Sequence, residues 1–274
     1  MVHWNTPHLL EACLHSLRDL PADRVTVLVI DNASASGLPA LASFAGPPLQ
    51  ILQLADNVGY AGAAFHALDV LRDGRFDALW LLNADVAVDP ETFHALEHAA
   101  AAEPEAVIGC VVLAHNGDQV RMPEKFLHAD RRWRFGRRDR EIPAVWFDAP
   151  LRPVQAVHGA AMWVPRSVFE RHGLFDPSFF LYCEETDYCL RLAKLGVPIR
   201  IAGQSRVRHV ERGSSISQPA VQQMLDYYRL RNELILWRQH APFWLPWISA
   251  QTGRLDGHEC SQTLRCTNAL ARLV

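Results

Sequence analysis

The chain has 274 residues, of which 49% are hydrophobic and 21% are charged, and its formal net charge is −3. That length permits one large α/β domain or two small ones, and the composition argues against a disordered chain and against a globally basic nucleic-acid-binding protein. No stretch approaches the ~18 uninterrupted apolar residues of a membrane span, and the N-terminus lacks the segments of a secretory signal. We therefore expect a cytoplasmic protein that binds no nucleic acid. The six cysteines have no CxxC spacing and are expected to be reduced thiols.

Apolar strands and helices alternate along the first part of the chain. Residues 9–20 have a helical apolar period, and residues 25–30 are typical of a strand that is buried on both faces of a parallel sheet. Asp89 and Pro90 fit the N-cap and first position of a further helix. This order favours an α/β fold with a doubly wound, mostly parallel sheet and helices on both faces, whose ligand lies at the carboxyl ends of the strands. Further strands are expected at 49–54, 78–82 and 106–113, and further helices at 61–71, 90–102 and 219–239.

A long basic block follows the strand expected at 106–113. Residues 121–140 are irregular in pattern and rich in arginine. The block is interpreted either as a solvated charged face or as a lid or contact for an anionic partner, and the pattern does not decide between them.

Polar side chains follow three of the predicted strands. A single Asp or Asn after a strand is usually a turn residue or a helix cap. Three such groups in succession on a parallel sheet would converge on one crevice, where carboxylates can accept from a base or ribose and can bind a divalent cation. Neither GxGxxG nor GxxxxGK[ST] occurs, which argues against a dehydrogenase and a P-loop kinase. The groups are Asp31 with Asn32, Asp56 with Asn57 and Gly59, and Asn83 with Asp85.

The densest acidic cluster contains Glu184, Glu185 and Asp187, just before a helix-like stretch. Negative charge at a helix N-terminus is a purely structural interpretation of this cluster. The alternative is a general base, because partial burial and a neighbouring like charge raise the pKa of a carboxyl group. His209 follows a short predicted strand, and is either a satisfied side chain or a ligand for a metal such as manganese.

Taken together, these motifs resemble family 2 glycosyltransferases, particularly the rhamnosyltransferase-like bacterial members. The resemblance implies a GT-A fold, a nucleotide-sugar donor, a divalent cation and an inverting displacement. We expect a GT-A-like catalytic domain over residues 1–235 and a C-terminal tail over 236–274, which is a candidate for poor order because its last part, from residue 244, has no clear periodicity. The matching segments are Val2-His-Trp-Asn5, Val29-Ile-Asp-Asn-Ala-Ser34, Asn57-Val-Gly-Tyr-Ala-Gly62, Leu81-Leu-Asn-Ala-Asp85, Gly173-Leu-Phe-Asp-Pro177 and Phe179-Phe-Leu-Tyr-Cys-Glu-Glu-Thr-Asp187.

The resemblance also implies roles for residues at the donor end. Asp31 would recognise the nucleobase, and the turn around Asn57 and Gly59 would line the nucleotide pocket, which Asn83 and Trp4 would complete. The donor would be a UDP- or dTDP-sugar.

The cation and the acceptor end follow from the same matches. Asp85 would occupy the metal-binding end of a DxD-like motif, and His209 would be the second protein ligand to Mg²⁺ or Mn²⁺ or to the diphosphate. Glu185 would be the base that deprotonates the acceptor hydroxyl, with Glu184 as the fallback. The donor and acceptor sugars would be bordered by His158, Gly159 and Asp187.

The expected reaction is transfer of a sugar, with rhamnose as the first candidate, to a hydroxyl of a glycan or lipid-linked acceptor. A catalytically degenerate nucleotide-sugar-binding module is the alternative, because the first strand is nearly absent and Ala63-Ala-Phe-His-Ala67 replaces a glycine- and asparagine-rich run. A sugar nucleotidyltransferase is a weaker alternative, since no glycine-rich phosphate loop precedes Asp31.

Contact with a membrane surface is a further hypothesis. Arginines at 131–140, with Trp133 and Phe135, would attract anionic lipid head groups at the inner face of the membrane. Trp237, Trp244 and Trp247 would act likewise or pack in the core. The pattern gives no indication of the oligomeric state.

Overall fold

The computed structural model describes residues 1–39, 41, 44–74, 76–114, 149–209 and 219–240. The chain divides into two units, Met1–Ile216 and Ser217–Val274. In the second unit the described element is helix α6 (Pro219–His240), which runs through the domain boundary expected after residue 235. The division into 1–235 and 236–274 stays a prediction. The basic block at 121–140 and the tryptophans at 244 and 247 lie outside the described residues.

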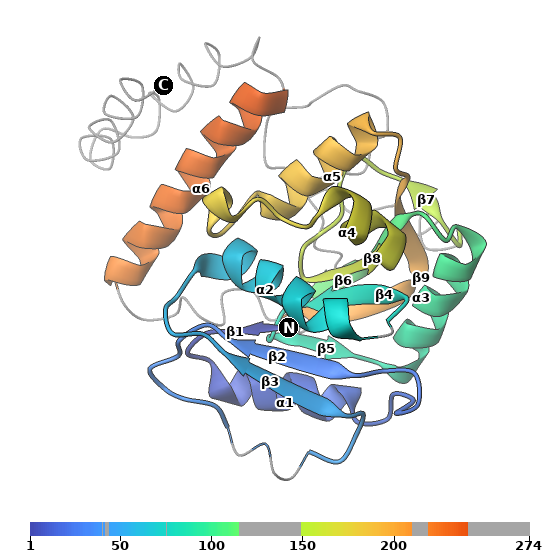
Figure 1. Ribbon diagram of the computed structural model, residues 1–274, viewed down its shortest axis with the longest axis horizontal. Coiled ribbons are helices and arrows are strands. Elements are labelled where there is room, and N and C mark those ends of the chain that lie inside the picture. The colour runs from blue at the N-terminus through green and yellow to red at the C-terminus, as the bar shows by residue number, and fades with distance from the viewer. Residues whose placement is uncertain (40, 42–43, 75, 115–148, 210–218, 241–274) are drawn as a thin grey trace. The chain divides into compact units, whose positions relative to one another are not determined.

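The N-terminal part of the first unit is a parallel three-stranded sheet in the order β1-β2-β3. Its strands are β1 (Val2–His3), β2 (Val27–Asp31) and β3 (Leu49–Gln53). Figure 1 shows helix α1 (Pro7–Leu17) and helix α2 (Gly59–Asp73) on opposite sides of these strands. Both faces of β2 are thereby covered, which explains why its sequence is a nearly continuous apolar run.

The second sheet has the order β4-β8-β6-β9-β5, with β7 also paired to β9. Only the β6–β9 pair is parallel among its strand pairs in the described residues, so this sheet is mixed. A parallel bridge between Val2 and Asn83 links the two sheets, and places the end of β4 beside β1. The strands are β4 (Ala78–Leu82), β5 (Val86–Val88), β6 (Val107–Ala114), β7 (Arg152–Pro153), β8 (Ala161–Pro165) and β9 (Ile199–His209).

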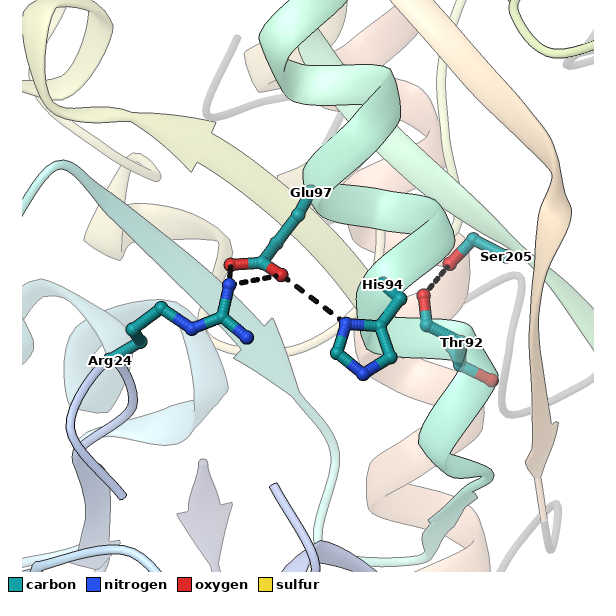
Figure 2. Close-up of polar contacts among 5 residues, drawn as sticks. All are labelled: Arg24, Thr92, His94, Glu97 and Ser205. Atoms are coloured by element: carbon teal, nitrogen blue, oxygen red, sulfur yellow. Dashed lines mark hydrogen bonds and ion pairs between the residues drawn. The ribbon is translucent and has the colours of Figure 1, made fainter. Parts of the chain in front are cut away.

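A bulge interrupts the pairing of β6 with β9. Cys110 pairs with Ala202, but the next residue of β6 pairs with Arg206. Ser205, within the bulge, is fully buried and donates its hydroxyl to the carbonyl of Thr92 at 3.0 Å (Figure 2). A bulge re-aims the side chains that follow it. The end of β9 is thereby set so that its last residue, His209, lies opposite Val86 of β5.

Helix α3 (Pro90–Ala102) begins as the sequence predicts, with Asp89 at the N-cap and Pro90 in the first turn, although the Asp89 side chain makes no capping hydrogen bond. Nη1 of Arg24 donates to both carboxylate oxygens of Glu97 at 2.9 Å, and Nδ1 of His94 lies 3.6 Å from one of them (Figure 2). Such exposed pairs contribute about 0–1 kcal/mol. Burial of the apolar face of α3, including Phe93 and Leu96, therefore dominates its attachment.

The remaining elements of the first unit lead into the acidic cluster. They are helix α4 (Arg166–His172), the 3₁₀ turn η4 (Pro177–Phe179) and helix α5 (Glu184–Lys194). No helix within the described ranges combines the length and apolar character needed to cross a membrane. The cysteines at 13, 110, 183 and 189 are thiols, as expected, and the other two lie outside the described residues.

Candidate active site

Asp31 is the last residue of β2 and lies at the carboxyl end of the parallel sheet, as predicted. Its side chain is buried, and Oδ1 accepts a hydrogen bond from the backbone N–H of Ser34 at 3.3 Å. The parallel register sets His3 of β1 opposite Asp31. Trp4, the other residue predicted at this end, directly follows β1 and is half-buried.

A buried amide, Asn32, holds the turn that leads into α2. Its Nδ2 donates to Oδ1 of Asn57 at 2.8 Å and to the carbonyl of Gly59 at 3.3 Å, and its Oδ1 accepts from the N–H of Val58 at 3.0 Å. Gly59 N–H also donates to Asn57 Oδ1 at 2.9 Å. The sequence predicted this turn but gave Asn32 no role of its own. The available signal was its position beside Asp31, since an amide can donate and accept at once.

The turn after β4 brings Asp85 to His209. Nε2 of His209 lies 3.0 Å from Oδ1 of Asp85 and 3.5 Å from Nδ2 of Asn83. Nδ1 of the same imidazole is buried without a hydrogen-bond partner in the described structure. The predicted metal ligands are therefore adjacent, and Asn83 lies beside them.

His158 lies against this pair. Its ring meets the ring of His209 edge to face, with 5.6 Å between centroids. Its Nδ1 accepts the backbone N–H of Ala160 at 3.0 Å, so the ring proton is carried by Nε2. Burial, and to a smaller extent the neighbouring His209, lower the pKa of His158 to about 4, with Asp85 partly opposing both effects. His158 is consequently a neutral imidazole near pH 7, with Nε2–H as a donor.

Backbone strain marks the segment just before the acidic cluster. Phe180, Tyr182 and Cys183 all have positive φ angles, of 61°, 71° and 68°. Non-glycine residues in this region cost of order 1–3 kcal/mol each, and they gather at functional sites where the surrounding structure fixes them. These backbone angles set the direction in which the chain enters α5.

The two glutamates of the cluster have different surroundings. Glu184 is 5% exposed and its Oε2 has no hydrogen-bond partner among the described residues. Burial raises the pKa of Glu184 well above its usual value, and the charge of Glu185 raises it further. Glu185 is only half-buried, and a Cβ placed on Gly159 would lie 3.4 Å from its Cβ and Cγ. Glu185 therefore faces the segment that carries His158.

Asp187, the third acidic residue, points to a different partner. Its Oδ2 accepts from Nε of Arg191 at 2.7 Å, one turn along α5, and its side chain is 2% exposed. This carboxylate supports α5 internally. Its predicted contact with a sugar stays a prediction.

Tyr60, which the sequence analysis did not single out, contacts the segment that carries His158. Its hydroxyl donates to the carbonyl of Gly159 at 3.2 Å. Burial raises the pKa of Tyr60, and the charges of Glu184, Glu185 and Asp85 raise it further, so all three carboxylates are near the phenol. The predicted residues at 85, 158, 159, 184, 185 and 209 thus surround one region.

The residues present fit a divalent cation. Asp85 and His209 offer an oxygen and a nitrogen ligand side by side, a donor set that suits Mn²⁺ and accepts Mg²⁺. Within the described ranges no group of three or more His, Cys, Asp or Glu residues could hold a metal ion. A cation here would need further oxygen ligands from its substrate.

This geometry agrees with the sequence comparisons. The model of the family described as "Glycosyltransferase like family 2" matches residues 2–228. The chain belongs to this family. The glycosyltransferase is 28% identical, over 261 residues, to the N-acetylglucosaminyl-diphospho-decaprenol L-rhamnosyltransferase of Mycobacterium tuberculosis, covering 87% of this chain and 82% of that relative. It is therefore a nucleotide-sugar-dependent glycosyltransferase.

Solved structures identify the fold as GT-A. S. aureus TarS 1–349 in complex with UDP matches with a TM-score of 0.60 at 14% identity, and the match covers 95% of this chain and 75% of that one. In a second TarS 1–349 structure, the match spans 58% of the TarS chain. The mannosyltransferase PcManGT from Pyrobaculum calidifontis, in complex with GDP-Man and Mn²⁺, matches with a TM-score of 0.56 at 17% identity, covering 100% and 79%. The expected α/β fold is confirmed.

Proposed function

We propose that this glycosyltransferase transfers a sugar from a nucleoside diphosphate to a hydroxyl of a glycan or lipid-linked acceptor, with inversion at the anomeric carbon. One observation carries the proposal. The short segment from His158 to Ala160 contacts the His209 ring through His158 and lies against Glu185 through Gly159. A donor sugar bound over this segment would have Asp85 and His209 near its diphosphate and a carboxylate near its anomeric carbon.

Glu185 acts as the base in this proposal. It accepts the proton of the acceptor hydroxyl, the oxygen forms a bond to the anomeric carbon, and the bond from that carbon to the diphosphate breaks with its electron pair. A single displacement of this kind inverts the configuration. Glu185 is preferred to Glu184 because Glu185 is half-exposed, whereas burial and the raised pKa of Glu184 favour its protonated form.

Asp85 and His209 would hold Mg²⁺ or Mn²⁺ together with the diphosphate. When bound, the cation would neutralise charge on the leaving group, which contributes several kcal/mol to the stability of a transition state. The neutral His158 would add an Nε2–H donor beside this charge. Mn²⁺ in the PcManGT complex supports a divalent cation in this fold.

The nucleotide would bind at the carboxyl end of β1 and β2. Asp31 would recognise the base, and the turn that Asn32 holds, with Asn57 and Gly59, would line the pocket. UDP or dTDP is the proposed nucleotide. L-Rhamnose is the first candidate sugar and a lipid-linked acceptor the first candidate acceptor, because the name of the mycobacterial relative includes both. Such an acceptor would be reached at the inner face of the membrane.

The test begins with a thermal-shift screen of UDP-, dTDP- and GDP-sugars, with and without Mn²⁺, since a ligand that binds only the folded state raises its Tm. Transfer by the best donor is then compared for wild type, Glu185→Gln and the exposed control Glu170→Gln. We expect Glu185→Gln to lower kcat by about 10²- to 10⁴-fold while nucleotide binding persists, and the control to retain activity. Undiminished turnover in Glu185→Gln overturns the base. A product with retained anomeric configuration overturns the displacement, and binding without any turnover favours the degenerate module.

A further inference from the structure

The first turn of α2 connects three parts of the site. The turn that precedes it is bonded to Asn32 on the nucleotide side. The N–H of Ala61 donates to the carbonyl of Phe180 at 3.1 Å, which joins α2 to the strained segment before Glu184. Between them, the hydroxyl of Tyr60 donates to the carbonyl of Gly159. A movement of this turn would therefore displace its contacts with Asn32, Phe180 and Gly159 together.

The ring of Tyr60 is itself anchored. It packs against Phe175 with 6.0 Å between centroids, and Phe175 meets Tyr188 edge to face at 5.6 Å. Phe175 and Tyr188 are 2% and 0% exposed. A hydroxyl on a ring packed in this way has little freedom, so its bond to Gly159 is held in place before any substrate arrives.

The segment that receives this bond touches both reacting ends of the proposed site. Gly159 lies against Glu185, since a Cβ there would be in van der Waals contact with two of its carbons, at 3.4 Å. Its neighbours tie the same segment to the cation end: His158 contacts His209, and the carbonyl of Ala160 accepts the N–H of Asn83 at 3.0 Å. A displacement of Gly159 would change the separation of the two ends.

We propose that Tyr60 is a positioning residue for glycosyl transfer, whose hydroxyl fixes the His158–Ala160 segment and thereby the separation between Glu185 and the Asp85–His209 pair. The inference rests on the proposed function. Tyr60 donates to a backbone carbonyl and does not take the acceptor proton. Loss of the hydroxyl is expected to affect the reacting geometry more than the binding of nucleotide, whose proposed contacts lie at Asp31 and the Asn57–Gly59 turn.

Tyr60→Phe tests this, because it removes the hydroxyl and keeps the ring. Tyr188→Phe is the matched control: it removes a hydrogen bond to the carbonyl of Gly173, 2.9 Å long, from the same aromatic group. We expect Tyr60→Phe to lower kcat about 10- to 100-fold, the size of effect that a misplacement of about 1 Å produces. Its KM for the nucleotide sugar and its Kd for UDP with Mn²⁺ should stay within about threefold of wild type, as a positioning role requires. Tyr188→Phe should lower Tm comparably and leave kcat near wild type.

A double-mutant cycle with Gly159→Ala supplies a second readout. The added methyl group would lie in van der Waals contact with Glu185 on the segment that Tyr60 holds, so the effects of the two substitutions on kcat should be non-additive. Wild-type kcat in Tyr60→Phe, a change in KM alone, equal loss in Tyr188→Phe, or additive losses in the cycle would each overturn the proposal. If Glu185→Gln is inactive while Tyr60→Phe is normal, only this inference fails. If Glu185→Gln is active, the proposed base fails.

Discussion

Nε2 of His209 and Oδ1 of Asp85 lie 3.0 Å apart because two antiparallel strands deliver them to the same point. Asp85 immediately precedes β5, and His209 ends β9, whose last three residues pair with β5. His209 is therefore held by a strand, and Asp85 by the short turn between β4 and β5, next to the first residue of β5. A ligand pair supported by strands in this way is held more precisely than one on a long loop.

Asp85→Asn should separate cation-dependent binding from nucleotide binding. The amide keeps the shape of the side chain but loses the charge, so we expect the affinity for UDP with Mn²⁺ to fall by about 10- to 100-fold. Affinity for UDP without metal should change little. Isothermal titration measures both, and Asp89→Asn, at an exposed position near by, is the control. Equal Mn²⁺ dependence in wild type and Asp85→Asn would contradict the assigned ligand.

Gly59→Ala is expected to destabilise the fold strongly. Gly59 has a φ of +76°, and a Cβ at this position would collide with the carbonyl oxygen and ring of Phe180. Gly196→Ala is the matched control, since its φ is +83° but nothing lies within 4 Å of its added Cβ. Backbone strain costs both variants about 1–2 kcal/mol, and overpacking costs Gly59→Ala about 1–3 kcal/mol more. Urea unfolding measures the difference; equal losses would mean that Phe180 moves aside freely.

Asp187→Asn tests the ion pair within α5, in which Asp187 is buried and the Arg191 side chain is 35% exposed. Arg191 would lose the carboxylate that accepts its hydrogen bond, and because its own charge stays partly solvated we expect a cost of about 1.5–3 kcal/mol. Glu170→Gln breaks the exposed Arg166–Glu170 pair and should cost less than about 1 kcal/mol. Chemical denaturation of the two variants gives both values. A stable Asp187→Asn protein that fails to transfer sugar would instead support the predicted sugar contact.

Glu184→Gln should alter how stability depends on pH. The pKa of Glu184 is higher in the folded than in the unfolded chain, so the folded protein binds more protons above pH 4.5, the usual value for this group. The free energy of unfolding therefore falls as pH rises from about 4.5 toward the folded pKa. The glutamine variant lacks this contribution, so its Tm should gain on wild type between pH 5 and 8. Exposed Glu11→Gln is the control, and a Tm difference that is constant with pH would refute the expectation.

Local sequence patterns predicted the type and bounds of several elements well. Residues 78–82 and 90–102 were predicted as the strand and helix that the structure contains, because apolar period and helix caps are local properties. The fold class and the family were also confirmed. The expected helix at 9–20 instead runs over Pro7–Leu17, since proline fits the first turn of a helix.

What the sequence did not reveal depends on distant residues. Strand β8 inserts antiparallel between β4 and β6, a pairing that no local pattern encodes. The short strand expected before His209 is the long bulged strand β9, whose shift in register depends on β6. Tyr60 meets Gly159 across the fold, and the positive φ angles before Glu184 arise from packing around ordinary residues. Such features need coordinates, because their cause lies outside the segments that carry them.

The bulge of β9 gives this enzyme an unusual kind of sequence constraint. Side chains of a strand alternate between faces, so losing a single residue from 203–205 would exchange the two faces of everything that follows. His209 would then turn away from Asp85, even though every amino acid of the site was still present. Substitutions in this stretch should therefore be tolerated far better than deletions. A redesigned β9 must keep the number of residues in the bulge, even where their identities change.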